Sequence, residues 1–436
     1  MIDHRDVSQP RNRRRHSEPG KPEGDSRSPA RRDRDRIIYT SAFRRLVYVT
    51  QVASPDHAHV FHNRLTHSLQ VAQVGRALAE KLVETQQQAA DALGGIDPDV
   101  VEAACLAHDL GHPPFGHTAE EELNNQTQES IGGFEGNAQS FRIVTKLAFK
   151  SEEGGLDLTR ATLSATLKYP WLRNQNKAKR DKWGAYESEL DDFTFARALG
   201  SKSVFSPTPE ARIMDWADDV TYSVHDMEDF YRAGRLPMDL LAQRKDAALR
   251  RFFDDVYRRN SSKADFYLRP DLEEVFGSLL AGFWRADEPY SGTKEQRSSL
   301  RRTTSHLIHR FIDAVSIDEK DQSIAINEEQ KKEVAILKEL TWTYVIEAPA
   351  LALQREGQKR IIGCLLDTYK SASRAKKNLS LFSPYYREQI DCTDSEEQRE
   401  RIVVDLIAGM TEPQALESYA QLMGVRPSST LQEIVR

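Results

Sequence analysis

The most informative part of this sequence reads Ala104-Cys105-Leu106-Ala107-His108-Asp109-Leu110-Gly111-His112-Pro113-Pro114-Phe115-Gly116-His117. The apolar residues before His108 continue a predicted helix that starts at Asp97-Pro98, where the aspartate caps the first turn and proline takes the first helical position. That helix should stop near Gly111, because the two prolines that follow forbid its continuation. His108 and Asp109 are therefore expected at a helix end, roughly 100° apart around its axis, where both can reach one ion.

Helical periodicity extends over most of the chain. Apolar residues recur at spacings of three and four after Asn63, which indicates an amphipathic helix entered from that residue. Thr118 and Glu121 have the spacing of a capping box for another helix. No run shows convincing strand alternation and no repeat is visible, so the fold class is predicted to be all-α. Further helical runs are expected over residues 65–83, 210–231, 333–347 and 357–369.

The bulk composition sets limits on function. The net charge is −6, which argues against a protein whose main task is to coat nucleic acid. The three cysteines have no paired spacing, so neither a disulfide framework nor a cysteine zinc site is indicated. No apolar run is long enough to cross a bilayer, and the N-terminal arginines precede no apolar signal segment. We expect an unprocessed protein of the cytoplasm with no membrane partner.

Three regions are expected along the chain. Residues 1–32 mix proline, serine, glycine and arginine with almost no apolar residue, which predicts a disordered basic arm. A solvated extension is the simpler interpretation of this arm, and a weak nucleic-acid contact is the alternative. Residues 33–235 carry the histidine-rich segments and form the predicted core. A boundary at Gly234-Arg235-Leu236-Pro237 precedes an ordinary helical region, residues 236–436.

Two further residues complete a candidate metal site. His67 would come from the helix before His108-Asp109, and Asp218 from a later helix. A single histidine on a helix face is more often a hydrogen-bonded structural residue, but buried imidazoles and carboxylates together need partners. This mixed nitrogen and oxygen set suits a divalent cation, manganese or magnesium first, with iron, cobalt or zinc as alternatives. Water at an open position would permit hydrolysis.

The sequence resembles HD-domain deoxynucleoside triphosphate triphosphohydrolases, the dGTPase-like group, from Asp33 to about Pro237. So many short blocks in the same order are far more specific than a His-Asp pair alone. The matching blocks are residues 34–38, 41–46, 50–52, 63–68, 108–117, 132–139, 168–170 and 214–222.

The resemblance implies metal ligation by His67, His108, Asp109 and Asp218. It also implies hydrolysis of a dNTP, dGTP or several of them, to a deoxynucleoside and inorganic tripolyphosphate.

The same resemblance implies roles around the substrate. His117, oriented by Glu120 three residues later, would transfer the proton, and Arg64 would clamp phosphate oxygens. His112 would contact phosphate or serve structurally. The remaining implied contacts are phosphate at Lys168 and Tyr169, the sugar and its 3′-hydroxyl at Tyr222 and Asp226, and the sugar or base at Gln51 and Val52.

For the C-terminal region the resemblance implies completion of the base pocket and homo-oligomer contacts, without residue assignments. In similar proteins dNTPs bound between subunits can activate, and whether a dNTP is an effector of this chain stays open. Two other functions stay open at this point. One is a different HD-domain phosphohydrolase that acts on nucleoside monophosphates or cyclic nucleotides. The other is a binding protein that senses dNTPs or holds nucleic acid through its basic arm.

Overall fold

The computed structural model describes residues 10–16, 24–51, 62–149, 154–199, 203, 205–242, 246–261, 266, 269–283, 289–375 and 378–425. Helices dominate these residues, which confirms the all-α prediction, and one antiparallel pair of short strands accompanies them. None of the described helices is both long and apolar enough to cross a membrane. In chain order the elements are α1 Pro29–Ile38, α2 Ser41–Arg45, α3 Arg64–Thr85, α4 Gln87–Ala92, α5 Pro98–Ala107, α6 His117–Thr127, α7 Gly136–Arg142, α8 Arg160–Ala165, α9 Leu190–Arg197, α10 Pro209–Arg232, α11 Met238–Ala242, α12 Asp246–Arg259, α13 Arg269–Phe283, α14 Lys294–Asp313, β1 Val315–Asp318, β2 Ser323–Ile326, α15 Glu328–Thr341, α16 Pro349–Ala375, α17 Pro384–Asp391, α18 Glu396–Ala408 and α19 Glu412–Leu422.

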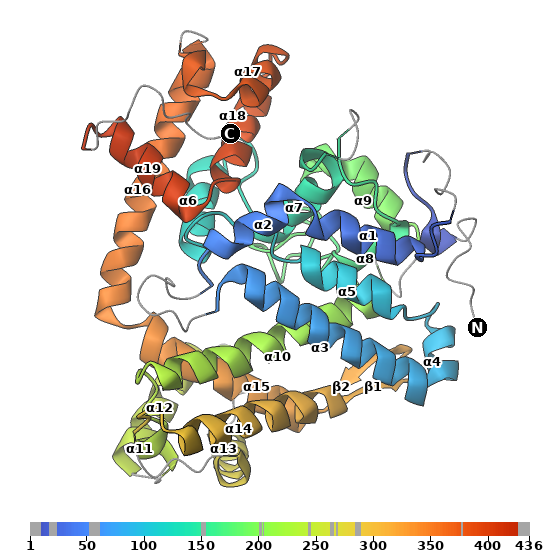
Figure 1. Ribbon diagram of the computed structural model, residues 1–436, viewed down its shortest axis with the longest axis vertical. Coiled ribbons are helices and arrows are strands. Elements are labelled where there is room, and N and C mark those ends of the chain that lie inside the picture. Colours follow the sequence, from blue (N-terminus) through green and yellow to red (C-terminus); the bar gives the residue numbers. More distant parts are fainter. Residues whose placement is uncertain are drawn as a thin grey trace.

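Three packed helices, α3, α5 and α10, form the centre of the molecule (Figure 1). Asn63 caps α3, since its side chain accepts the N–H of Thr66 while the Thr66 hydroxyl accepts the N–H of Asn63. Asp97 caps α5, and Pro98 takes its first position. These two predicted helix starts are confirmed. Thr208 caps α10 in the same manner.

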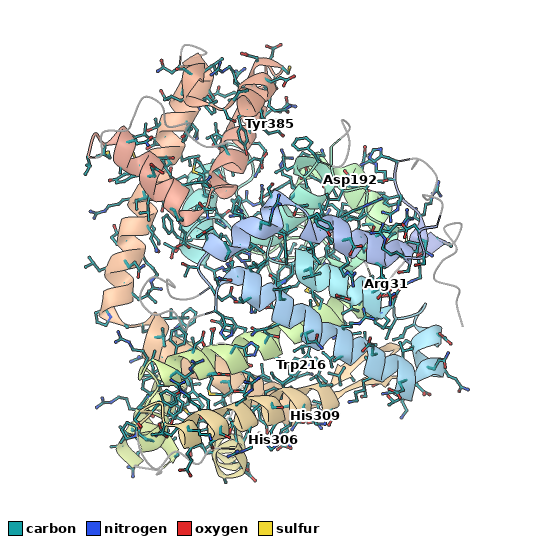
Figure 2. All side chains as sticks on the ribbon, in the orientation of Figure 1. Arg31, Asp192, Trp216, His306, His309 and Tyr385 are labelled. Carbon is teal, nitrogen blue, oxygen red and sulfur yellow. The ribbon has the colours of Figure 1, made fainter. Side chains whose placement is uncertain are left out.

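Two large apolar cores and a smaller cluster of Ala138, Trp171, Trp183 and Tyr186 hold the described helices together. The larger packs α1, α3, α5 and α10 against α13, α14 and α15. Within it, Trp216 of α10 lies toward α14 (Figure 2) and donates its indole N–H to the carbonyl of Phe311 at 3.1 Å. The second core joins Phe115, Ala119 and Phe134 to apolar residues of α16, α18 and α19. The C-terminal helices therefore pack directly on the segment that follows the His-Asp pair.

The described parts of the N-terminal arm lie against the core. Arg14 Nη1 is 2.7 Å from Asp33 Oδ1, Arg15 Nη1 is 2.5 Å from Asp192 Oδ1, and Arg11 pairs with the buried Glu210. Helix α1 also begins inside the arm. Carboxylates distant in sequence thus neutralise Arg11, Arg14 and Arg15. The disorder expected for the arm as a whole stays a prediction.

Two local predictions fail. The capping box of Thr118 and Glu121 is wrong, because α6 begins at His117 with Gly116 at the cap position and no side-chain cap. Gly116 has a φ of 57°, a conformation that glycine adopts without strain. The strands β1 and β2 were not predicted, since four residues are too few for alternation to be distinguished from chance.

Candidate active site

The four predicted metal ligands meet where α3, the end of α5 and α10 approach one another. His67 lies in the first turn of α3, His108 is the C-cap residue of α5, and Asp218 lies in the third turn of α10. His67 Nε2 is 3.0 Å from Asp218 Oδ1. His108 Nε2 is 3.6 Å from that oxygen and 3.5 Å from Asp109 Oδ1. Ligand atoms of His67, His108 and Asp109 all lie within 4.8 Å of one another.

A main-chain contact decides which nitrogen of His108 faces this group. His108 Nδ1 lies 2.6 Å from the carbonyl oxygen of Cys105, and because a carbonyl only accepts, Nδ1 carries the proton. His108 Nε2 is buried and has no hydrogen-bond partner among the described residues. When the ring is neutral, the Nε2 lone pair lies beside carboxylate oxygens, which also only accept. A bound cation, either a proton or a metal ion, then satisfies the group.

The pKa values show that the site favours positive charge. Burial by itself would lower the pKa of His108, but Asp109 and Asp218 outweigh it and raise that pKa to about 9. Burial would raise the pKa of both aspartates. Arg64 and the histidines around Asp109, and Lys168 with the histidines around Asp218, instead hold both pKa values well below their usual range.

Arg64 and Lys168 hold the outer oxygens of the ligand carboxylates. Arg64 Nη1 donates to Asp109 Oδ2 at 2.7 Å, while its Nε donates to the Thr50 carbonyl at 3.1 Å. Lys168 Nζ is 3.1 Å from Asp218 Oδ2 and 2.6 Å from Asp215 Oδ1. The family resemblance predicts only phosphate contacts for Arg64 and Lys168. The structure adds that both side chains hold the aspartates in their orientation toward the histidines.

The donor set fits a divalent metal ion. Two neutral imidazoles and two carboxylates would neutralise a dication, and this mixed nitrogen and oxygen set is compatible with manganese, magnesium, iron, cobalt or zinc. The burial of the ligands and the hydrogen bonds that fix them are typical of metal sites, in which outer contacts orient the ligands.

His117 and Glu120 form a second polar cluster beside the ligands. His117 Nδ1 is 2.8 Å from Glu120 Oε2, and 72% of the His117 side chain is exposed. Lys182 Nζ donates to Glu120 at 2.9 Å and to Glu135 at 3.0 Å. Burial would raise the pKa of Glu120, but His117 and Lys182 hold it well below its usual range. The carboxylate therefore stays ionised and orients the imidazole.

His112 lies between these two clusters. Its ring meets that of His117 edge-on, with centroids 5.2 Å apart, and its Nδ1 is 3.0 Å from Asp109 Oδ1. Burial, with the charge of Arg64, lowers the pKa of His112 to about 4, so the ring is neutral near pH 7. A Cβ at Gly136 would lie 3.4 Å from this ring.

All these side chains surround one cavity of about 470 Å³. It is lined by ten of the residues predicted from the sequence, namely Gln51, Arg64, His108, Asp109, His112, His117, Lys168, Tyr169, Asp218 and Tyr222. Three predicted residues, His67, Glu120 and Asp226, do not line the cavity but lie behind residues that do. Val52 lies outside the described residues.

Tyr222 and Asp226 are one turn apart on α10, and only Tyr222 lines the cavity. Burial raises the pKa of Asp226 well above its usual range, and nearby Asp229 adds to the effect. Asp226 Oδ2 is buried without a hydrogen-bond partner among the described residues. A buried carboxyl oxygen without a partner, one helical turn from the cavity-lining Tyr222, is a suitable place for a ligand hydroxyl.

Sequence reasoning missed several lining residues. The polar run 177–182 is typical of an exposed loop, but Lys182 lines the cavity, and the buried Trp183 that follows it is a signal that this loop returns to the core. Asp219, the neighbour of Asp218, also lines the cavity and pairs with Lys338 of α15 at 2.5 Å. Three other missed residues, Thr50, Phe115 and Asn137, lie within the matching blocks 50–52, 108–117 and 132–139. No local motif marks the rest, which are Thr118, Glu121, Lys338, Trp342, Ile346, Leu351, Gln354, Arg355 and Gln358.

Comparison with known proteins identifies the family. The HD domain matches residues 64–223, and the phosphohydrolase-associated domain matches residues 324–421. The chain is 38% identical over 432 residues to the deoxyguanosinetriphosphate triphosphohydrolase-like protein of Streptomyces coelicolor, which covers 93% of this chain and 95% of that protein. The corresponding protein of Corynebacterium glutamicum is 33% identical over 407 residues, 89% of each chain. That of Shewanella baltica is 30% identical over 471 residues, 96% of this chain and 97% of that protein. The chain therefore belongs to the deoxyguanosinetriphosphate triphosphohydrolase-like family of HD-domain proteins.

Proposed function

We propose that this protein hydrolyses deoxynucleoside triphosphates to a deoxynucleoside and inorganic tripolyphosphate, with a divalent metal ion held by His67, His108, Asp109 and Asp218. The observation that carries the proposal is the unsatisfied Nε2 of His108, buried beside two carboxylates in a cavity that also holds several cationic side chains. The names and coverage of the relatives support the same substrate class.

The cations of the cavity suit a polyphosphate. Arg64, Lys168 and Lys182 line the metal-ligand side, and Lys338 and Arg355 come from the C-terminal helices. A triphosphate carries more negative charge than a monophosphate or a cyclic nucleotide, so this charge distribution favours the larger substrate. In the arm, Arg14 and Arg15 pair with Asp33 and Asp192, which leaves these two side chains less available to nucleic acid.

The deoxyribose would lie against Tyr222, and Asp226 would accept a hydrogen bond from its 3′-hydroxyl. This position is supported by the unpartnered Oδ2 of Asp226 and by the place of Tyr222 on the cavity wall, next to Asp218 on the same helix. A close fit against the tyrosine ring would exclude a 2′-hydroxyl. The base would extend toward Gln51 and the α16 residues of the opposite wall.

The chemistry that a divalent cation supplies when bound is Lewis-acid stabilisation of phosphate charge and activation of water. The protein's own groups do the rest. Arg64 offers Nη2, its one guanidinium nitrogen without a partner among the described residues, to a phosphate oxygen. Because Glu120 accepts from Nδ1 of His117, Nε2 is the nitrogen left for the substrate. In the imidazolium form, Nε2 would give its proton to the departing 5′-oxygen, and the ring would keep the proton on Nδ1.

The test is to incubate the full-length protein with each dNTP and each rNTP plus Mn²⁺, and to separate tripolyphosphate from phosphate and pyrophosphate. We expect tripolyphosphate from one or more dNTPs, none from rNTPs, and no activity in His108→Ala or Asp109→Ala. Release of orthophosphate, or turnover only of monophosphates or cyclic nucleotides, would contradict the proposed substrate. Steeply salt-dependent DNA binding that deletion of residues 1–32 abolishes, without any turnover, would support a binding protein instead.

We also propose a homo-oligomer of the cytoplasm in which bound dNTPs can act as effectors, since the family resemblance implies an oligomer and dNTPs can activate similar proteins. Light scattering after gel filtration, with and without each dNTP, measures the oligomer directly. A monomer under every condition would contradict this part of the proposal.

A further inference from the structure

The carboxylate of Glu412, the first residue of α19, contacts two loops of the catalytic cavity. Its Oε1 accepts the N–H of Thr50 at 2.6 Å and the N–H of Phe115 at 3.1 Å. Its Oε2 accepts the Thr50 hydroxyl at 2.8 Å. Thr50 and Phe115 both line the cavity, whereas Glu412 does not. One side chain from the C-terminal helices thus holds two segments that are more than sixty residues apart in the sequence.

A continuous chain of hydrogen bonds leads from Glu412 to a candidate metal ligand. The N–H of Thr50 is held by Glu412, and its carbonyl accepts Arg64 Nε at 3.1 Å. Arg64 Nη1 then donates to Asp109 Oδ2 at 2.7 Å. Displacement of Thr50 would therefore move the guanidinium that orients the Asp109 carboxylate.

The second contact of Glu412 holds a strained turn. Phe115 has a φ of 67°, a left-handed conformation that is uncommon for a residue with a bulky side chain. Its N–H donates to Glu412, and its ring belongs to the core formed with the C-terminal helices. This turn directly precedes Gly116 and His117, so its geometry decides where the proposed proton donor lies.

Arg45 joins the same two regions through a second set of hydrogen bonds. This buried guanidinium donates through Nη1 to the carbonyl of Met410 at 3.0 Å, and through Nη2 to those of Leu110 and His112 at 2.8 Å each. The segment 410–412 is therefore tied to both ends of the loop between Asp109 and His117.

We infer that Glu412 is a positioning residue, through which the C-terminal helices fix Thr50, Arg64 and the loop from Asp109 to His117 in the geometry that the metal site requires. It supplies no ligand and touches no substrate. The inference deepens the proposed function by assigning the phosphohydrolase-associated segment a part in metal binding. Its test does not require the substrate to be a dNTP.

The test compares four full-length proteins: wild type, Glu412→Ala, Glu412→Asp and Glu412→Gln. Mn²⁺ affinity is measured by calorimetry without nucleotide, and amide exchange is followed by mass spectrometry without metal. We expect Glu412→Ala to weaken Mn²⁺ binding about 10-fold to 100-fold, the usual effect of losing a group that orients ligands. Exchange should accelerate in peptides covering residues 46–51 and 110–117 and remain unchanged elsewhere.

The other variants separate positioning from folding. Glu412→Asp keeps the acid at the helix start but is one methylene too short, so it should show the same local effect even if Glu412→Ala fails to fold. Glu412→Gln should retain near wild-type affinity, because its amide oxygen can accept both N–H groups. Glu397→Ala is the matched control, since Glu397 is an exposed acid in the first turn of α18; it should change neither measurement.

Three results would overturn the inference: unchanged Mn²⁺ affinity in Glu412→Ala and Glu412→Asp, accelerated exchange spread over all of α16–α19, or an equal loss in Glu412→Gln. Failure of the proposed function would give a different result. The wild-type protein would then bind Mn²⁺ and show slow amide exchange in residues 46–51 and 110–117, but would hydrolyse no dNTP.

Discussion

His117 differs from the ligand histidines because most of its side chain is open to the cavity while Glu120 holds its Nδ1 from behind. We predict that His117→Ala lowers kcat about 10²-fold to 10⁴-fold, the range typical of a general acid or base. Mn²⁺ affinity should stay unchanged, because no ligand is removed. His309→Ala is the control, since His309 is an exposed histidine of α14 (Figure 2). A variant that keeps its kcat would remove His117 from the reaction.

His225 gives the protein a pH dependence in the acid range. It is buried, its ring stacks on that of His62 with centroids 5.0 Å apart, and burial with nearby His62 lowers its pKa to about 3. The folded state thus keeps this ring neutral, while the unfolded chain takes up a proton as the pH falls through about 6.5. The contribution of His225 to the free energy of unfolding is therefore complete above the pKa of the ring in the unfolded chain. It is lost as the pH falls toward the pKa of the ring in the folded protein.

We therefore predict that His225 contributes a loss of about 2 kcal/mol in the free energy of unfolding between pH 7 and pH 5. Urea unfolding of the wild type and of His225→Gln at both pH values measures it. The loss should be smaller by that amount in the variant. The exposed His306 of α14 (Figure 2) supplies the control His306→Gln. Equal losses in wild type and His225→Gln would show that the imidazole is already protonated in the folded protein.

At the scale of elements, one part of the cavity wall is formed by the segment that connects α15 to α16. The sequence predicted a helix over 333–347, but α15 ends at Thr341 and a π-helical turn, Trp342–Ile346, follows it. This turn places Trp342 and Ile346 at the cavity, and α16 then presents a stripe of cavity-lining residues at helical spacing. The stripe consists of Leu351, Gln354, Arg355 and Gln358.

Because a carboxamide can both donate to and accept from a base edge, we predict that Gln358 contributes to the choice among dNTPs. Gln358→Ala should change the ratio of kcat/KM between the preferred dNTP and the others by up to about tenfold, the worth of one hydrogen bond. The Mn²⁺ affinity should not change. Glu356→Ala is a control on an exposed position of α16 that does not line the cavity. Parallel loss for all four dNTPs would argue against base recognition here.

At the scale of the whole molecule, a buried charge network joins the HD core to the C-terminal helices. Arg142 of α7 donates to both oxygens of Asp405 in α18, at 2.8 to 3.1 Å, and to Glu189 at 2.6 Å. Both carboxylates are almost fully buried. We predict that Arg142→Met lowers the free energy of unfolding by about 3–5 kcal/mol, because it leaves the buried Asp405 without its cation and Glu189 with only the longer contact to Lys146 Nζ at 3.4 Å.

Urea unfolding followed by circular dichroism measures this loss. Arg360→Met is the control, since Arg360 pairs with Glu356 at the surface and both side chains are mostly exposed. Its effect should stay below about 1 kcal/mol. A loss of similar size in the two variants would mean that the Arg142 network contributes no more than a surface ion pair.

The sequence by itself determined the helical class and the caps at Asn63 and Asp97, because caps and helical periodicity depend on neighbours within a few positions. It also singled out His67, His108, Asp109 and Asp218, which the structure brings close together. The family resemblance added proposed roles that no local pattern could supply. Only the tertiary structure decided that Arg64 and Lys168 contact the carboxylates of Asp109 and Asp218, that Lys182 and α16 line the cavity, and that Glu412 contacts two loops of the cavity. These contacts join residues that lie tens to hundreds of positions apart in the sequence. The sequence around a charged residue is the same whether its side chain is solvated or buried. Its role depends on burial and on a distant partner, and only tertiary packing brings the side chain and that partner together.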